Sequence, residues 1–176
     1  MSDGAVTFIL GGARSGKTRH GLALAEAQRA SGRQTIYIAT AQAHDDEMQD
    51  RIDKHKQERD SEWRTVDAPL DLAGAIADNS ATDTCLLIDC LTLWATNLLL
   101  GDHDIDAESD RLIAALKNAQ GPVILVSNEV GLGIVPEKKL ARQFRDIAGR
   151  LNQDVAATAN RVVFVAAGLP LVLKGE

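Results

Sequence analysis

Short continuous apolar runs alternate along the chain with longer segments in which apolar residues recur every three or four positions. The runs are typical of buried parallel strands, and the recurring spacing is typical of amphipathic helices. The predicted strands are 6–10, 35–39, 63–66, 84–89, 123–127, 161–166 and a short last one at 171–173. The predicted helices are 17–30, 45–59, 70–77, 91–100, 108–119 and 137–157. This alternation indicates an α/β fold, with a mostly parallel sheet covered by helices on both faces in one domain spanning residues 1–176.

The helix at 137–157 has the clearest amphipathic pattern. Its apolar stripe consists of Leu140, Phe144, Ile147, Leu151 and Val155. Steps of three and four residues place these side chains on one helix face. We therefore expect the whole stripe to face the core.

Composition describes an ordinary globular protein. The chain has 176 residues, of which 45% are apolar and 3% aromatic, enough for one domain with a core. The formal net charge of −6 gives no overall attraction to nucleic acid or to anionic membranes, so neither is an expected partner. Cys85 and Cys90 form no metal-ligand pattern and are predicted to be core residues in a reducing compartment. There is no signal-peptide pattern and no apolar segment of membrane length, so a cytoplasmic location is expected.

The most informative motif directly follows the first predicted strand. Gly11-Gly12-Ala13-Arg14-Ser15-Gly16-Lys17-Thr18 fits the phosphate-loop pattern G-x-x-x-x-G-K-[ST]. Its glycines let backbone amides point at phosphate oxygens, and the next helix adds its N-terminal dipole. Lys17 is predicted to contact the β- and γ-phosphates and Thr18 to bind Mg²⁺. The alternative, a glycine-rich turn that binds nothing, is disfavoured because all signature residues and both flanking elements are present. The sequence thus predicts a RecA-like P-loop fold that binds ATP or GTP with Mg²⁺.

Asp89 ends an apolar predicted strand, which is the second signature of phosphate-loop proteins. In such proteins the carboxylate approaches Mg²⁺ directly or through water. The alternative is that Asp89 caps the helix beginning at Leu91. Because ligands bind at the carboxyl ends of parallel strands, we expect Asp89 to meet the phosphate loop there, together with segments 39–41 and 127–129.

His55 is a candidate nucleophile. On the predicted helix, Arg51, His55 and Arg59 recur at four-residue steps, which gives that helix a basic edge carrying an imidazole. A neutral imidazole can attack phosphorus near pH 7. On spacing alone, a solvated helix face is the more common explanation. The remaining histidines, His20, His44 and His103, are predicted to lie on the surface.

Several further segments resemble those of one family. They are YIATAQ at 37–42, RIDKHKQER at 51–59, DCLTLWATNLL at 89–99, SNEVGLGIVP at 127–136 and ARQFRDIAGRLNQ at 141–153. Together with GGARSGKT, they resemble the bifunctional adenosylcobinamide kinase/adenosylcobinamide-phosphate guanylyltransferase of cobalamin biosynthesis. The resemblance covers residues 8–174, and the segments at 127–136 and 141–153 are far more specific than the phosphate loop.

The resemblance implies two reactions. In the first, ATP or GTP phosphorylates the hydroxyl of the aminopropanol arm of adenosylcobinamide. In the second, GMP passes from GTP to adenosylcobinamide phosphate through a guanylylated histidine, giving adenosylcobinamide-GDP and pyrophosphate. His55 occupies the position of that histidine. Relatives are trimers, which implies a homo-oligomer here.

The resemblance also implies the residues of the site. The catalytic residues are His55 and Lys17, and Mg²⁺ falls on Thr18 and Asp89. The guanine-nucleotide contacts are Gly11, Gly12, Ala13, Arg14, Ser15, Gly16, Lys17, Thr18, Ala39, Thr40, Ala41, Lys56, Gln57, Glu58, Arg59, Asp67 and Asp89. The base for the cobinamide hydroxyl is left open: Glu129 is a candidate, and a structural role for it is equally compatible with the sequence.

Two other classes of function fit the phosphate loop alone. One is a kinase of another small alcohol in which His55 is unreactive. The other is a GTPase-like switch, although such proteins usually carry an N-K-x-D segment, and Asn128-Glu129 lacks the lysine and aspartate. Covalent labelling by α-labelled GTP separates both from a guanylyltransferase.

Overall fold

The computed structural model describes residues 4–42 and 63–175. In this part of the chain, strands form one seven-stranded sheet in the order β3-β2-β4-β5-β1-β6-β7. Their bounds are β1 (Val6–Gly11), β2 (Gln34–Ala39), β3 (Arg64–Asp67), β4 (Thr84–Asp89), β5 (Val123–Asn128), β6 (Arg161–Ala166) and β7 (Leu169–Lys174). Neighbouring strands are parallel except β6 and β7, which are antiparallel. The predicted mostly parallel α/β sheet is confirmed.

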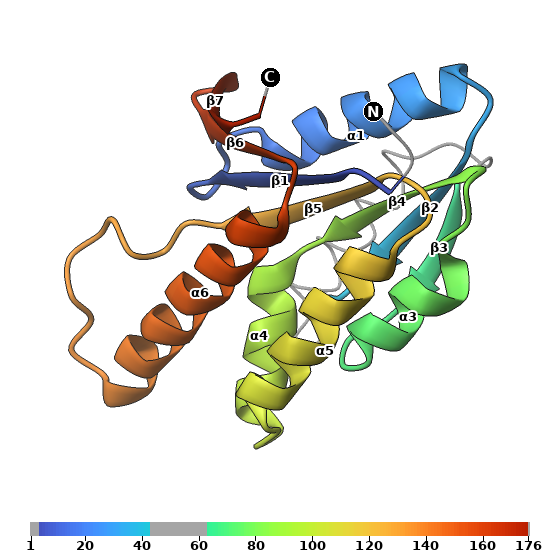
Figure 1. Cartoon of the computed structure of the whole chain (residues 1–176). Helices are drawn as coiled ribbons and strands as arrows, with labels where there is room; N and C mark the ends of the chain where they lie inside the picture. The colour runs from blue at the N-terminus through green and yellow to red at the C-terminus, as the bar shows by residue number, and fades with distance from the viewer. Residues whose placement is uncertain (1–3, 43–62, 176) are drawn as a thin grey trace.

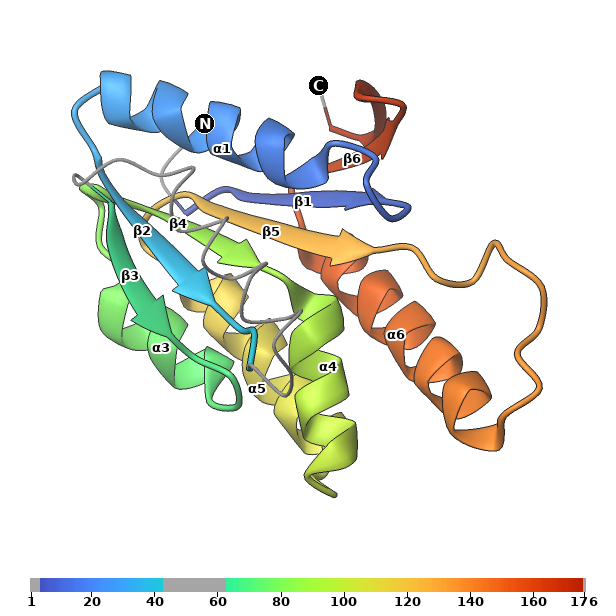
Figure 2. The same ribbon diagram turned by 180° about the vertical axis from the view of Figure 1, so that it is seen from behind.

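The described helices cover both faces of this sheet. Helix α1 (Lys17–Ala30) lies on one face, and α3 (Leu72–Asn79), α4 (Leu91–Leu100), α5 (Ile105–Asn118) and α6 (Lys139–Thr158) lie on the other (Figure 1 and Figure 2). None of the helices in the described ranges combines the length and apolar character that a membrane crossing requires. The predicted helix at 45–59 lies outside the described residues.

The sheet separates two parts of the hydrophobic core, and β1 contributes to both. Phe8 packs in the cluster on the side of α3 to α6, and Ile9 packs in the cluster on the side of α1. Successive strand residues point to opposite faces, and both side chains are fully buried because helices cover each face. A strand buried on both faces gives a rigid support to the loop that follows it.

Aspartate caps shift the start of two helices from the predicted positions. Helix α3 begins two residues later than predicted, because the Asp71 carboxylate accepts a hydrogen bond from the Gly74 amide at 3.1 Å. Helix α5 begins at Ile105, three residues earlier than predicted, because Asp104 accepts from the Ala107 amide at 3.0 Å. Asp104 lies in a polar stretch where apolar spacing gives no signal, and Asp71 is a single polar residue within an apolar one.

Two predictions at the C-terminal third need correction. The apolar stripe of α6 does not face the core along its whole length, since Leu140 is 52% exposed while Leu151 and Val155 are buried. The first turns of α6 lie beyond the edge of the sheet (Figure 1). The last strand is longer than predicted and forms a hairpin with β6.

Both thiols should be inert in the folded protein. Burial raises the pKa of Cys85 to about 12, and burial together with the nearby Asp89 carboxylate raises that of Cys90 to about 12. Because the thiolate is the reactive form, an aromatic disulfide reagent at pH 8 should detect almost no thiol in the native protein. In denaturant the same assay should count two thiols per chain. Rapid reaction of the native protein would contradict the predicted burial of the cysteines.

Candidate functional site

The phosphate loop rises from the carboxyl end of β1, near the middle of the sheet. It runs from Gly11, the last residue of β1, to Lys17, the first of α1. Gly16 has φ 99°, a left-handed conformation that favours glycine. A Cβ on Gly11 would overlap the carbonyl oxygen of Val165, so glycine also allows the loop to pass close to β6.

Lys17 lies inside the loop rather than in solvent. Only 7% of it is exposed, and its Nζ donates a hydrogen bond to the carbonyl oxygen of Gly12 at 2.7 Å. Burial lowers the pKa of the ammonium group, and the nearby Cys90 and Asp89 act against this shift. The Ser15 hydroxyl is also buried and has no hydrogen-bond partner among the described residues. Phosphate oxygens are acceptors that both groups could bind.

Thr18 and Asp89 meet, although 71 positions separate them in sequence. The Thr18 hydroxyl donates a hydrogen bond to Asp89 Oδ2 at 2.8 Å. Asp89 ends β4, and the N-cap of α4 is Cys90, which makes no side-chain cap. The Asp89 carboxylate is thus directed at the phosphate loop, as the nucleotide-site interpretation predicts.

This pair fits a magnesium ion bound with a nucleotide. Mg²⁺ takes oxygen ligands and usually keeps several from water and substrate phosphates, so one hydroxyl and one carboxylate suffice from the protein. In the described ranges, His, Cys, Asp and Glu side chains form no group of three that could hold a metal ion by themselves. The donor set therefore fits a nucleotide-associated cation rather than a separate metal site.

Three predicted contact residues form a row along the edge of the sheet. The parallel register places Ala39 of β2 directly between Asp67 of β3 and Asp89 of β4. Asp67 is exposed, and Asp89 is half-buried. The row lies on the β3 side of the phosphate loop.

Thr40 has a buried side chain that is used for structure. Its hydroxyl donates to the carbonyl oxygen of Cys90 at 2.7 Å and accepts from the Cys90 amide at 2.8 Å. The Asn97 side chain donates to the Thr40 carbonyl at 2.8 Å and to the Pro69 carbonyl at 3.0 Å. These contacts hold the loops after β2, β3 and β4 together, and the side chain of Thr40 is closed to a ligand.

Four predicted contacts and the predicted nucleophile lie outside the described residues. The nucleophile is His55, and the contacts are Lys56, Gln57, Glu58 and Arg59. His44 also lies outside the described residues. Of the other histidines, His103 is exposed in the loop before α5, and His20 is half-buried on α1. Burial and the charge of Arg161 lower the pKa of His20.

Sequence reasoning missed the side chains that hold the end of β5. The Asn128 amide donates to the Thr92 hydroxyl at 2.7 Å, and the Asn152 side chain donates to the Asn128 carbonyl at 3.3 Å. Next to them, the Glu129 amide donates to the Gly11 carbonyl at 3.0 Å, which ties this segment to the phosphate loop. The sequence contained a signal for these side chains, since Thr92 and Asn152 are polar residues on the buried faces of their helices.

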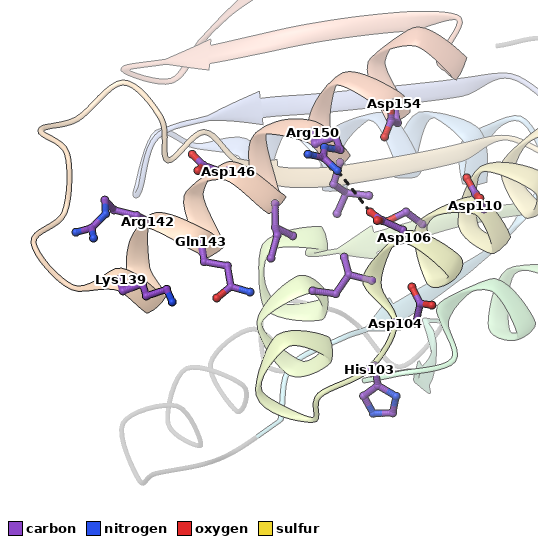
Figure 3. A pocket seen from close by; sticks show the side chains of 14 residues that line it. His103, Asp104, Asp106, Asp110, Lys139, Arg142, Gln143, Asp146, Arg150 and Asp154 are labelled. Carbon is purple, nitrogen blue, oxygen red and sulfur yellow. Dashed lines mark ion pairs between the residues drawn. The ribbon is translucent and has the colours of Figure 1, made fainter.

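A separate groove of about 980 Å³ lies between α5 and α6 (Figure 3). Aspartates dominate one wall, and Arg150 forms an ion pair with Asp106 across it at 3.7 Å. Its lining comes from α5, the loop before it and α6, without the phosphate loop or Asp89. The groove is therefore distinct from the site at the strand ends.

Two solved structures are similar to this chain in fold. The flagellar accessory protein FlaH from Methanocaldococcus jannaschii superposes with a TM-score of 0.63 and 14% identity, over 100% of this chain and 80% of that one. A KaiC-like protein from Pyrococcus horikoshii gives a TM-score of 0.52 and 15% identity, over 93% of this chain and 72% of that one. At such identities the likeness concerns the fold alone, and it confirms the predicted RecA-like class.

Sequence relatives match almost from end to end. The bifunctional adenosylcobalamin biosynthesis protein CobP of Pseudomonas aeruginosa is 51% identical over 172 residues, which cover 96% of this chain and 97% of the relative. The CobU protein of the same description from Escherichia coli is 45% identical over 182 residues, which cover 95% and 98%. The family model described as cobinamide kinase / cobinamide phosphate guanyltransferase matches residues 7–173. The chain therefore belongs to the cobinamide kinase / cobinamide phosphate guanyltransferase family, as its motifs predict.

Proposed function

We propose that this chain phosphorylates adenosylcobinamide with ATP or GTP and then transfers GMP from GTP to the product through guanylylated His55. The observation that best supports the proposal is the contact between Thr18 and Asp89 beside the buried Lys17. Lys17 supplies a positive charge, Thr18 and Asp89 supply two oxygen ligands, and the phosphate loop beside them supplies backbone amides. A bound nucleoside triphosphate with its cation requires these groups together.

In the kinase step the chain mainly positions and stabilises charge. Lys17 exchanges the Gly12 carbonyl for phosphate oxygens and offsets charge on the transferring phosphoryl group. Thr18 and Asp89 would hold Mg²⁺, which would supply further positive charge against the triphosphate. The cobinamide oxygen forms the new bond to the γ-phosphorus, and the bond to the β-phosphate oxygen breaks.

Glu129 is the proposed base for the cobinamide hydroxyl. Its amide is hydrogen-bonded to Gly11, so its backbone is fixed next to the phosphate loop. A carboxylate there can accept the hydroxyl proton as the oxygen attacks.

In the guanylyl step the neutral imidazole of His55 attacks the α-phosphorus of GTP, and the bond to pyrophosphate breaks. Lys17 and the loop amides stabilise the departing pyrophosphate. A phosphate oxygen of adenosylcobinamide phosphate then attacks the same phosphorus, and the nitrogen–phosphorus bond breaks. The row of Asp67, Ala39 and Asp89 supports a guanosine position on the β3 side, where the Asp67 carboxylate can accept hydrogen bonds from guanine.

A homo-oligomer, taken by family resemblance to be a trimer, is part of the same proposal. The loop before α6 exposes Leu132 at 81% and Ile134 at 98%, and such apolar exposure is consistent with coverage by another subunit. Sedimentation equilibrium gives the mass directly.

Replacing Lys17 tests the kinase step. Lys17→Ala removes the ammonium group nearest the β- and γ-phosphates, so phosphorylation of adenosylcobinamide should fall by about 10²–10³-fold. Labelled phosphate transfer from γ-labelled ATP measures it, and Lys117→Ala, on the exposed side of α5, is the control. Full activity in a folded Lys17→Ala protein would overturn the kinase assignment.

Replacing His55 separates the two half-reactions. His55→Ala should abolish covalent labelling by α-labelled GTP and the formation of adenosylcobinamide-GDP, because the nucleophile is lost. Phosphorylation by ATP should persist, since that step needs no imidazole. His103→Ala, at an exposed loop position, should behave as the unmodified chain in both assays. A GMP adduct on the His55→Ala protein would identify another nucleophile, whereas no adduct on the unmodified chain would leave a kinase alone.

The bond type gives an independent test of the adduct. GMP on an imidazole nitrogen is a phosphoramidate, and protonation of that nitrogen creates a good leaving group. The labelled protein should therefore lose GMP in mild acid and keep it in brief alkali, with the label in the peptide 52–59. Adduct formation should also weaken below about pH 6, because a free imidazole protonates near pH 6.5. An acid-stable adduct, or one in the phosphate loop, would indicate an ester on a hydroxyl instead.

A further inference from the structure

We infer that the turn between β6 and β7, together with Arg19, is the nucleoside subsite for the triphosphate that donates the phosphoryl group. The subsite lies on the side of the phosphate loop opposite to Ala39 and Asp67. The inference rests on the proposed kinase step and adds to it the place and orientation of the donor's purine nucleoside.

Two consecutive residues of α1, Thr18 and Arg19, indicate the direction in which a bound nucleotide extends. Thr18 is directed at β4, where its hydroxyl bonds to Asp89. Arg19 is directed at the β6–β7 turn, where a Cβ built on Gly168 would lie 3.2 Å from Arg19 Nη2. Because Thr18 and Asp89 mark the β- and γ-phosphate end, the α-phosphate and the nucleoside extend from that end towards Arg19 and the turn.

The turn is joined directly to the phosphate loop. The Gly168 amide donates a hydrogen bond to the Ser15 carbonyl at 2.8 Å. Ala167 and Gly168 have φ of 51° and 81°, which is the geometry of a tight two-residue hairpin turn. Figure 1 and Figure 2 both show the β6–β7 hairpin beside the start of α1. A ligand held in the loop therefore has this turn as its neighbour.

The turn and its surroundings offer chemistry suited to a purine. Leu169, the first residue after the turn, is 72% exposed and presents an apolar surface. The planar guanidinium of Arg19 can lie over a purine ring or contact the α-phosphate. An apolar surface with a few polar groups beside an anion-binding loop is the usual composition of a nucleotide pocket.

The order of strands keeps this subsite apart from the guanosine position of the second step. β2 lies three strands from β1, roughly 14 Å at the usual strand spacing, on the side of β5 and β4. β6 and β7 lie one and two strands from β1 on the other side. A nucleoside on Ala39 and Asp67 and a nucleoside on Leu169 therefore extend from the phosphate loop in opposite directions. The phosphoryl donor and the guanylyl donor bind in opposite orientations over the same loop.

The test compares two leucines of one exposed strand. Leu169→Ser removes the apolar surface at the turn, and Leu173→Ser makes the same change at the far end of β7, where Leu173 is 57% exposed. KM for ATP in the phosphorylation of adenosylcobinamide should rise about threefold to tenfold in Leu169→Ser, as expected for losing one apolar contact. KM for GTP in the covalent labelling of the protein should stay unchanged. Leu173→Ser should match the unmodified chain in both reactions.

Two kinetic outcomes would overturn the inference. An unchanged KM for ATP in Leu169→Ser would show that the turn does not contact the donor. An equal rise in both KM values would show a single nucleotide orientation. Calorimetric titration with ATP in Mg²⁺ measures the affinity for ATP without any reaction. It therefore tests the subsite even if the unmodified chain forms no phosphorylated product. In that case the proposed function fails, and a weaker ATP affinity in Leu169→Ser alone still supports the subsite.

Discussion

Parallel pairing of β1 with β5 on one side and β6 on the other is the constraint on which the site depends. Strands that run in one direction bring their carboxyl ends to one edge, and β1 lies inside the sheet with both faces covered. The phosphate loop therefore emerges between two rows of strand ends, with Asp89 on one side and the β6–β7 turn on the other.

Helix α4 holds much of the rest of this edge in place. It follows Asp89 directly, and three of its buried side chains bond to backbone atoms of other loops. Thr92 accepts from the end of β5, Trp94 donates to the Leu70 carbonyl at 2.7 Å, and Asn97 donates to the carbonyls of Thr40 and Pro69. A buried carbonyl without such a partner costs free energy, so these bonds fix loops that would otherwise move independently.

Strands could be predicted from sequence more closely than contacts. β4 and β6 match their predicted ranges, because continuous apolar runs bounded by polar residues mark a buried strand. The start of α5 and the exposure of Leu140 could not be read from periodicity, since one depends on a single aspartate cap and the other on where the sheet ends. The phosphate loop and Asp89 were predictable as local motifs. The hydrogen-bond partners of Asn97 and Asn152 were not predictable, because they are backbone atoms brought near only by the tertiary fold.

The hydrogen bond from Lys17 to the Gly12 carbonyl has a thermodynamic consequence. A buried ammonium group without a partner would destabilise the loop, so the bond lets the loop keep its shape before any nucleotide arrives. Much of the conformational entropy of ordering the loop is then lost during folding rather than during binding. Phosphate must then displace an existing contact, so the contribution of Lys17 to the enthalpy of binding is the difference between two hydrogen bonds to the same nitrogen. The loop is therefore ordered before a nucleotide binds, and the cost is that each nucleotide must displace the Gly12 carbonyl from Lys17.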